Sequence, residues 1–167
     1  MPQSTVQGPA GRTAVLALGS NLGDRLERLY AATRMLGVVA VSGVYETASV
    51  GGPDQDDYLN AVVLVPAAPP HALLAAVRSA EQAALRVRTV HWGPRTLDVD
   101  VIACGDLVSD DPEILIPHPR AHTRAFVCVP WLDVEPDAIL PGHGRVADLV
   151  AGMDVSGVRR TPWNLNR

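Results

Sequence analysis

Two aspartates stand at alternate positions in the segment TLDVDVIA, close behind a run of arginines. Asp98 and Asp100 lie in a stretch rich in β-forming residues, without a glycine or proline after Pro94. In a strand, residues i and i+2 point to the same face, with Cα atoms roughly 6–7 Å apart. Such a pair suits Mg²⁺, which takes one or two carboxylates together with phosphate oxygens. The alternative is a solvated strand face with a surface ion pair, and this segment alone leaves both open.

Three arginines surround the turn that precedes these aspartates. Arg86, Arg88 and Arg95 lie in the segment RVRTVHWGPR. A guanidinium group can bind phosphate oxygens through two parallel hydrogen bonds. Each arginine taken singly is also typical of a solvated helix end, where positive charge suits the helix dipole. Three of them beside two aspartates favour a phosphate-binding site.

The segment IPHPRAHTRAF, residues 116–126, carries a second group of basic side chains. Two prolines hold His118 in a turn, and Arg120, His122 and Arg124 follow at alternate positions. A lone histidine is usually structural, but His118 beside arginines is consistent with a second phosphate-facing element. The aspartates lack the histidine spacing of a zinc site, and His118 and His122 lack an intervening glutamate, so we expect no zinc site.

The few aromatic residues include a possible binding pair. Tyr58 stands two residues before Asn60, and Phe126 ends the basic segment. Two aromatic rings can hold a flat heterocycle, while an amide reads its edge through one donor and one acceptor group. Taken singly, Phe126 is better explained as a core residue and Tyr58 as a strand-surface residue. The segment ALGSNLGDR, residues 17–25, is not a Walker A loop, and it favours a tight turn with a helix cap over a phosphate cradle.

The composition narrows the classes of function. The chain has 167 residues, enough for one domain with a core, and its net charge of −4 provides no basic field for nucleic acid. It contains no lysine, so phosphate contacts must come from arginine, histidine or backbone N–H groups. Cys104 and Cys128 indicate small core residues of a reducing compartment. No apolar run reaches membrane-spanning length, and we expect a cytoplasmic monomer without nucleic-acid or membrane partners.

The order of predicted elements indicates an α+β fold. The first helix begins at a capping-box-like pair, Asp24 and Glu27, and the second begins at Pro69 and Pro70. Strands are expected at 13–20, 38–47, 58–65 and 96–103, and helices at 24–36 and 69–88. This βαββαβ order is that of a ferredoxin-like domain.

A C-terminal extension follows the predicted βαββαβ core. It consists of a hairpin within 105–116 and a final helix near 146–152. We expect residues 1–12 to form a disordered extension, 13–160 a single domain and 161–167 a tail.

Taken together, these motifs resemble those of the 6-hydroxymethyl-7,8-dihydropterin pyrophosphokinases of folate biosynthesis. The matching pieces are ALGSNLGDR, VYET, YLNAVV, RVR with WGPRTLDVD, and IPHPR with RAF, which span about residues 15 to 130. The combination of WGPRTLD-x-D with a later P-H-P-R is highly specific. The resemblance implies a ferredoxin-like fold and transfer of the diphosphoryl group of ATP to the hydroxymethyl oxygen of the pterin, with release of AMP.

The resemblance also implies a role for each matching residue. Asp98 and Asp100 would hold two Mg²⁺ ions along the triphosphate, and Arg86 and Arg95 would act on the transferred phosphates. Contacts to ATP are implied for Arg86, Arg88, Arg95, Ile102, His118 and Arg124. Contacts to the pterin are implied for Thr47, Ala48, Val50, Tyr58, Asn60, Phe126 and Asp98. Trp92 would lie on a mobile catalytic loop that we expect to close over both substrates.

Several positions depart from the pattern of the family. His91 precedes Trp92 where an arginine is common, Arg78 stands where some members have glutamine, and Pro119 follows His118 where some have tyrosine. These departures concern loop contacts, and the aspartates and pterin residues are intact. Three rival functions remain: a non-catalytic ferredoxin-like binding module, a metal-dependent nucleotide hydrolase and a single-strand RNA binder. The last is disfavoured because the acidic chain lacks a basic sheet with paired aromatics.

Overall fold

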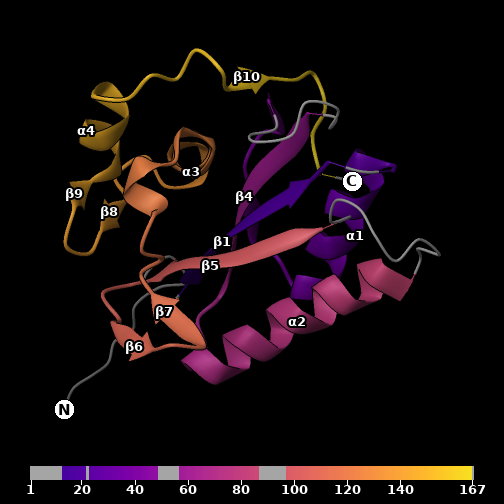
Figure 1. Cartoon of the computed structure of the whole chain (residues 1–167), viewed down its shortest axis with the longest axis horizontal. Helices are drawn as coiled ribbons and strands as arrows, with labels where there is room; N and C mark the ends of the chain where they lie inside the picture. Colours follow the sequence, from indigo (N-terminus) through magenta and orange to yellow (C-terminus); the bar gives the residue numbers. More distant parts are fainter. Residues whose placement is uncertain (1–12, 22, 49–56, 87–96, 167) are drawn as a thin grey trace.

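The computed structural model describes residues 13–21, 23–48, 57–86 and 97–166 (Figure 1). An antiparallel sheet forms its centre, in the order β3-β4-β1-β5 with β10 (Arg159–Arg160) outside β3. This is the strand arrangement of a ferredoxin-like domain, so the predicted fold is confirmed. The core elements are β1 (Thr13–Ser20), α1 (Arg25–Leu36), β2 (Ala40–Val41), β3 (Tyr45–Thr47), β4 (Tyr58–Pro66), α2 (Pro70–Arg86) and β5 (Asp98–Cys104).

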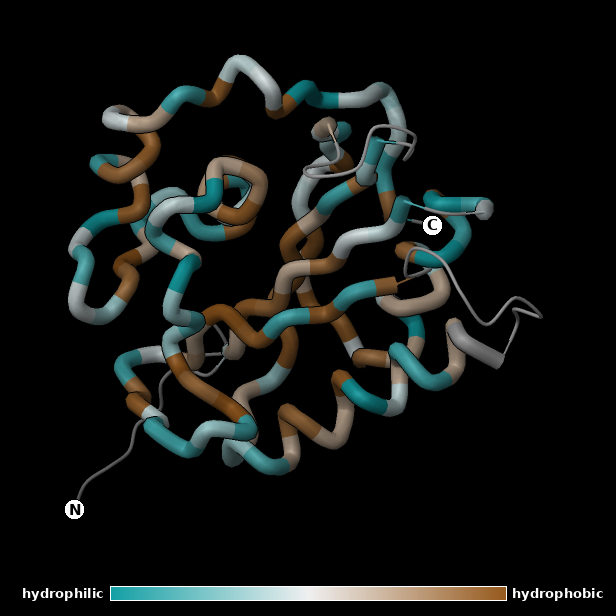
Figure 2. The backbone as a smooth tube through the Cα atoms, in the orientation of Figure 1, coloured by the Kyte–Doolittle hydropathy of each residue, from teal (hydrophilic) through white to brown (hydrophobic). Residues whose placement is uncertain are grey.

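Different helices cover the two faces of the sheet (Figure 1). Because side chains alternate along a strand, Leu16 and Leu18 of β1 share one face, where they join Val77 of α2 in the first core cluster. Ile102 of β5 points to the other face and packs in a second cluster with Trp131 of α3 (Ala125–Val134). Figure 2 shows hydrophobic residues gathered along the central strands and in α3. The sheet is therefore buried on both sides over much of its length.

The helix α1 begins and ends with local signals that the sequence contains. The Asp24 carboxylate accepts a hydrogen bond from the Glu27 backbone N–H at 3.1 Å, which satisfies one of the unpaired donors of the first turn. Gly37 ends the helix in the left-handed conformation at φ 66°. Glycine adopts this left-handed backbone conformation at little cost because it has no Cβ atom.

The single strand predicted over 38–47 is divided into β2 and β3. Val41 pairs with Val63, but Tyr45 pairs with Asn60, so one extra residue lies between the two pairs on the β2–β3 side. Ser42 bridges the irregularity, since its Oγ accepts a hydrogen bond from the Val62 N–H at 2.9 Å. The extra residue forms a bulge in the ladder, and β-propensity alone does not reveal such a bulge.

The C-terminal extension contains the predicted hairpin and final helix, and also a helix that we did not predict. Its elements are β6 (Ser109–Asp111), β7 (Ile114–Ile116), η2 (Ala121–Thr123), α3, β8 (Ile139–Leu140), β9 (Gly144–Arg145), α4 (Val146–Ala151) and β10 (Arg159–Arg160). The unpredicted helix is α3, with the sequence AFVCVPWLDV and Pro130 in its interior. It is apolar on nearly every side because it is buried against the sheet, so it has no amphipathic period.

The C-terminal residues return to the sheet. The Thr161 backbone N–H donates to the Val44 carbonyl oxygen at 2.9 Å, and Leu165 is buried in the first core cluster. The limits that we predicted for the domain stay predictions. Among the described residues, no helix has the length and apolar character needed to span a membrane.

Candidate active site

A cavity of about 430 Å³ opens on the sheet face that α3 also covers. It lies over the part of the sheet where β1, β4 and β5 carry small or polar residues in place of large apolar ones. It contains most of the described residues that the sequence singled out. The lining residues are Ala17, Leu18, Gly19, Thr47, Ala48, Tyr58, Asn60, Asp98, Asp100, Arg124 and Phe126.

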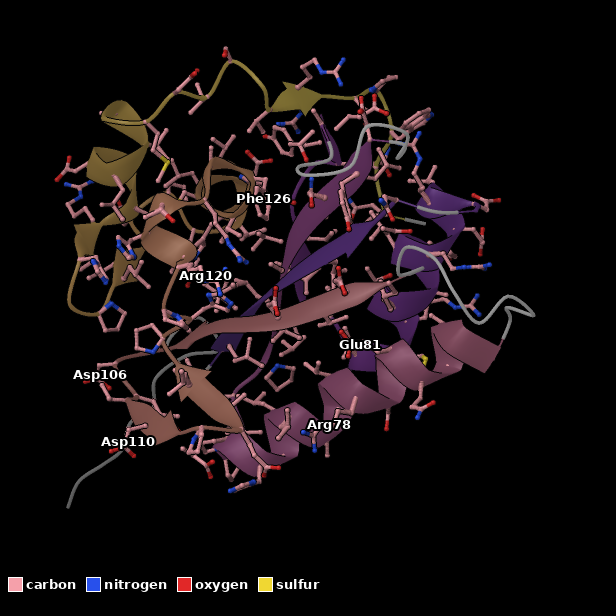
Figure 3. The ribbon with its side chains drawn as sticks, viewed as in Figure 1. Arg78, Glu81, Asp106, Asp110, Arg120 and Phe126 are labelled. Atoms are coloured by element: carbon pink, nitrogen blue, oxygen red, sulfur yellow. The ribbon has the colours of Figure 1, made fainter. Side chains whose placement is uncertain are left out.

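The side of the cavity that β4 and α3 form carries two aromatic side chains and an amide, and we call it the slot. Tyr58 and Asn60 lie on the same face of β4. Phe126, which Figure 3 labels, comes from the first turn of α3. The Asn60 side chain is buried, and its Nδ2 donates to Thr47 Oγ1 at 2.7 Å. This bond fixes the orientation of the amide at the wall of the cavity. The slot therefore offers two aromatic surfaces and a fixed amide.

Small residues of β1 form the floor of the cavity, and our sequence reasoning did not assign them to the site. Gly19 pairs with Asn60 on one side and with Asp98 on the other. A Cβ atom added at Gly19 would lie 3.2 Å from Asn60 Oδ1 and 3.6 Å from Tyr58 Cδ1. The signal was present in the sequence, since Ala17 and Gly19 place small side chains at alternate positions of a strand whose other face carries leucine.

The β5 side of the cavity carries the two aspartates. Asp98 and Asp100 lie on the same face of β5, as predicted, and both are half-buried. Arg124 Nη1 lies 3.8 Å from Asp100 Oδ2, and its guanidinium carbon lies 5.6 Å from the centre of the Phe126 ring. Arg124 thus stands between the carboxylate pair and the aromatic slot.

The strand that carries the aspartates is fixed from the opposite face by α2. Glu81 Oε2 accepts a hydrogen bond from the Val99 backbone N–H at 2.8 Å, between the two aspartates in sequence. Figure 3 shows Glu81 on the side of α2 that faces β5. A charged acceptor makes a stronger hydrogen bond than a neutral one, so this contact holds β5 firmly against the helix.

His118 lies next to the aspartates and has a defined protonation pattern. Its Nδ1 accepts a hydrogen bond from the Arg120 backbone N–H at 3.1 Å, which leaves Nε2–H as the donor of the neutral ring. Burial lowers the pKa of His118, and the charges of Arg124 and Arg120 act in the same direction while Asp100 opposes them. The backbone N–H of His118 donates to the Ile102 carbonyl oxygen at 2.9 Å. Neither His118 nor Ile102 lines the cavity, and the Ile102 side chain is completely buried.

Several predicted site residues cannot be placed. Val50, Arg88, Trp92 and Arg95 lie outside the described residues, and Arg86 is described only as the last residue of α2. The expectation that the Trp92 loop closes over the substrates lies outside them too. Within the described parts of the chain, no three His, Cys, Asp or Glu side chains gather as a metal site.

Comparison with known proteins identifies the family. The sequence profile of 7,8-dihydro-6-hydroxymethylpterin-pyrophosphokinase (HPPK) matches residues 15–136. The chain belongs to the HPPK family. A protein of Mycobacterium leprae named 2-amino-4-hydroxy-6-hydroxymethyldihydropteridine pyrophosphokinase is 46% identical over 171 residues, covering 90% of each chain. One of the same name from Methylorubrum extorquens is 40% identical over 154 residues, covering 88% of this chain and 97% of its own.

Solved structures agree with the fold of the HPPK family. The HPPK-DHPS protein of Plasmodium falciparum superposes with a TM-score of 0.67 at 12% identity. The match covers 84% of this chain and 45% of that longer one, so this chain spans less than half of the solved protein. At this identity the likeness shows the fold alone, and it agrees with the ferredoxin-like strand order described above.

Proposed function

We propose that the chain transfers the diphosphoryl group of ATP to the hydroxymethyl oxygen of 6-hydroxymethyl-7,8-dihydropterin, giving AMP and the pterin diphosphate for folate biosynthesis. The observation that carries the proposal is the single cavity that joins an aspartate pair to an aromatic and amide slot. Membership of the HPPK family supports the same reaction. One cavity can then hold the pterin at one end and the triphosphate at the other.

The slot suits a pterin, which is flat, uncharged and rich in hydrogen-bonding groups. Tyr58 and Phe126 would lie against the ring faces, and Asn60 would bond the ring edge through its oxygen and its remaining N–H. Thr47 holds that amide in place, so the edge contact is ready before the ligand arrives. With Ala48, and with Val50 outside the described residues, these side chains make up the proposed pterin site.

The aspartate pair suits magnesium. The two carboxylates lie on one strand face and line the cavity. They match the donor set that Mg²⁺ prefers when a polyphosphate supplies the remaining ligands. We propose that Asp98 and Asp100 hold two Mg²⁺ ions. Bound there, the metal would neutralise phosphate charge and lower the pKa of the attacking hydroxyl group.

Basic residues near the aspartates would position the phosphates. Arg124 stands beside Asp100 and can donate from its guanidinium group to phosphate oxygens, and His118 can donate from Nε2. Diphosphoryl transfer requires in-line placement and charge neutralisation more than covalent help from the protein. We propose further phosphate contacts for Arg86, Arg88 and Arg95, and an ATP contact for Ile102.

The deciding experiment is an AMP-release assay with each component omitted in turn. The proposal predicts AMP only when ATP, Mg²⁺ and the dihydropterin are all present. AMP release without the pterin would indicate a nucleotide hydrolase, and no AMP under any condition would indicate a binding module. We also propose that the protein acts as a cytoplasmic monomer, which sedimentation of the purified protein and cell fractionation would test.

A further inference from the structure

Two arginines and two acidic residues connect four segments that are far apart in the chain. Arg25 Nη1, at the start of α1, donates to Glu46 Oε2 at 2.8 Å and to the Asp57 carbonyl oxygen at 2.7 Å. Arg159 of β10 lies 3.0 Å from Asp57 Oδ2 and 3.9 Å from Glu46 Oε1. These four residues are termed the Arg25 cluster. The Arg25 and Glu46 side chains are only 23% and 26% exposed, so salt screens their attraction less than that of a surface pair.

The Arg25 cluster lies directly behind two strands that form the wall of the slot. Glu46 precedes Thr47 on β3, and Asp57 precedes Tyr58, the first residue of β4. Thr47 and Tyr58 pair with each other in the ladder, and both line the cavity. Because side chains alternate along a strand, Glu46 points away from the face that Thr47 presents. The cluster therefore holds the wall from the opposite face and does not enter the cavity.

Arg25 is the centre of the cluster because one nitrogen reaches both strands. It joins a side chain of β3 to a main-chain oxygen just before β4. The strand β3 has only three residues, so few ladder hydrogen bonds hold its end in place. The charge-assisted bond from Arg25 is stronger than a single neutral ladder bond.

We propose that Arg25 is a positioning residue for pterin binding, an inference that rests on the proposed function. It sets the spacing between Thr47 and Tyr58, and through Thr47 the orientation of the Asn60 amide. A slot held at the bound width loses less freedom when the ligand enters than a slot that must first close. The aspartate pair lies on β5, at the other end of the cavity, so this role concerns the pterin and not the nucleotide.

The test compares the binding of two ligands by the full-length protein and its variants. Arg25→Ala is expected to raise the Kd of the dihydropterin roughly tenfold and to leave the Kd of a non-hydrolysable ATP analogue with Mg²⁺ nearly unchanged. Arg25→Lys should restore part of the affinity, because lysine keeps the charge but lacks the guanidinium fork. Arg34→Ala is the matched control, since Arg34 lies on the same helix and its guanidinium carbon is 5.4 Å from the centre of the Tyr30 ring.

A second variant keeps the proposal falsifiable if Arg25→Ala folds poorly. Glu46→Ala removes the other partner and should weaken pterin binding in the same way, and the double variant should lose less than the sum of the two. Equal weakening of both ligands, in step with a fall in melting temperature, would reduce Arg25 to a stabilising residue and overturn the inference. If the wild-type protein binds the pterin and both variants bind it equally well, the inference about Arg25 is overturned while the proposed function stands. A wild-type protein that does not bind the pterin would overturn the proposed function, and the inference with it.

Discussion

Replacing Gly19 by alanine adds one methyl group to the floor of the slot. The new Cβ atom would lie 3.2 Å from Asn60 Oδ1 and 3.6 Å from Tyr58 Cδ1. Asn60 cannot easily retreat, because it is only 5% exposed and its Nδ2 is bonded to Thr47 Oγ1 at 2.7 Å. The substitution therefore displaces the amide that we assign to the pterin edge, or narrows the space beside it.

The expected magnitude follows from the packing. Forcing one extra methyl group into a filled site typically costs about 1–3 kcal/mol, which corresponds to a rise of about 5- to 150-fold in the Kd of the pterin. The free protein should also lose part of its stability, because the new Cβ atom meets Asn60 Oδ1 before any ligand binds, and a change in the unfolded chain offsets some of this loss. Where alanine can adopt the backbone conformation of a glycine, the substitution makes the unfolded chain less flexible. This effect stabilises the fold by about 0.4–1 kcal/mol.

Calorimetric titration measures this effect with the dihydropterin, with and without a non-hydrolysable ATP analogue and Mg²⁺. The affinity of Gly19→Ala for the ATP analogue should remain close to that of the wild type. Gly157→Ala is the control, because a Cβ atom there would have no neighbour within 4 Å. Unchanged pterin affinity in Gly19→Ala, or an equal loss for both ligands, would refute the assignment of this end of the cavity to the pterin.

Two further predictions concern single side chains. Phe126→Ala should weaken pterin binding by about 1–3 kcal/mol, the usual loss for one stacking aromatic, and leave ATP affinity nearly unchanged. Calorimetric titration with each ligand measures this. An equal loss of affinity for both ligands would indicate that Phe126 is a core residue. Cys128 is fully buried, and burial raises the pKa of its thiol to about 11. At about pH 8 only about one such thiol in a thousand is ionised, so a thiol-reactive dye should label Cys104 alone in the native protein and both cysteines after denaturation. Labelling of Cys128 in native Cys104→Ser protein would contradict its burial.

The core of the fold could be predicted because local and tertiary signals agree there. The strand at 13–20 was predicted at its observed limits, and the cap at Asp24 gave the first helix its start. The spacing of Asp98 and Asp100 also predicted a shared face, since a strand allows no other arrangement of residues two apart. In each case a few neighbouring residues determine the local geometry.

The features that were missed depend on contacts between distant segments. The helix α3 is apolar on nearly all sides because the sheet and α4 bury it, so its sequence carries no helical period. The bulge between β2 and β3 depends on how Ser42 meets the N–H of Val62 on the neighbouring strand. The alternation of Ala17 and Gly19 with leucine indicates only a face of small residues, and the part that Gly19 plays in the site depends on its pairing with both Asn60 and Asp98.

The central claim is that the chain transfers a diphosphoryl group from ATP to the pterin at the aspartate pair. Phosphorus NMR of the complete reaction tests it most directly, by comparing the wild type with Asp98→Ala and Asp100→Ala. The account predicts equal amounts of AMP and pterin diphosphate from the wild-type protein. Each variant should remain folded by circular dichroism and lose most of its turnover, because removing one carboxylate costs several kcal/mol of transition-state stabilisation. Near-normal turnover by either variant at saturating Mg²⁺, or formation of ADP in place of AMP, would contradict the account.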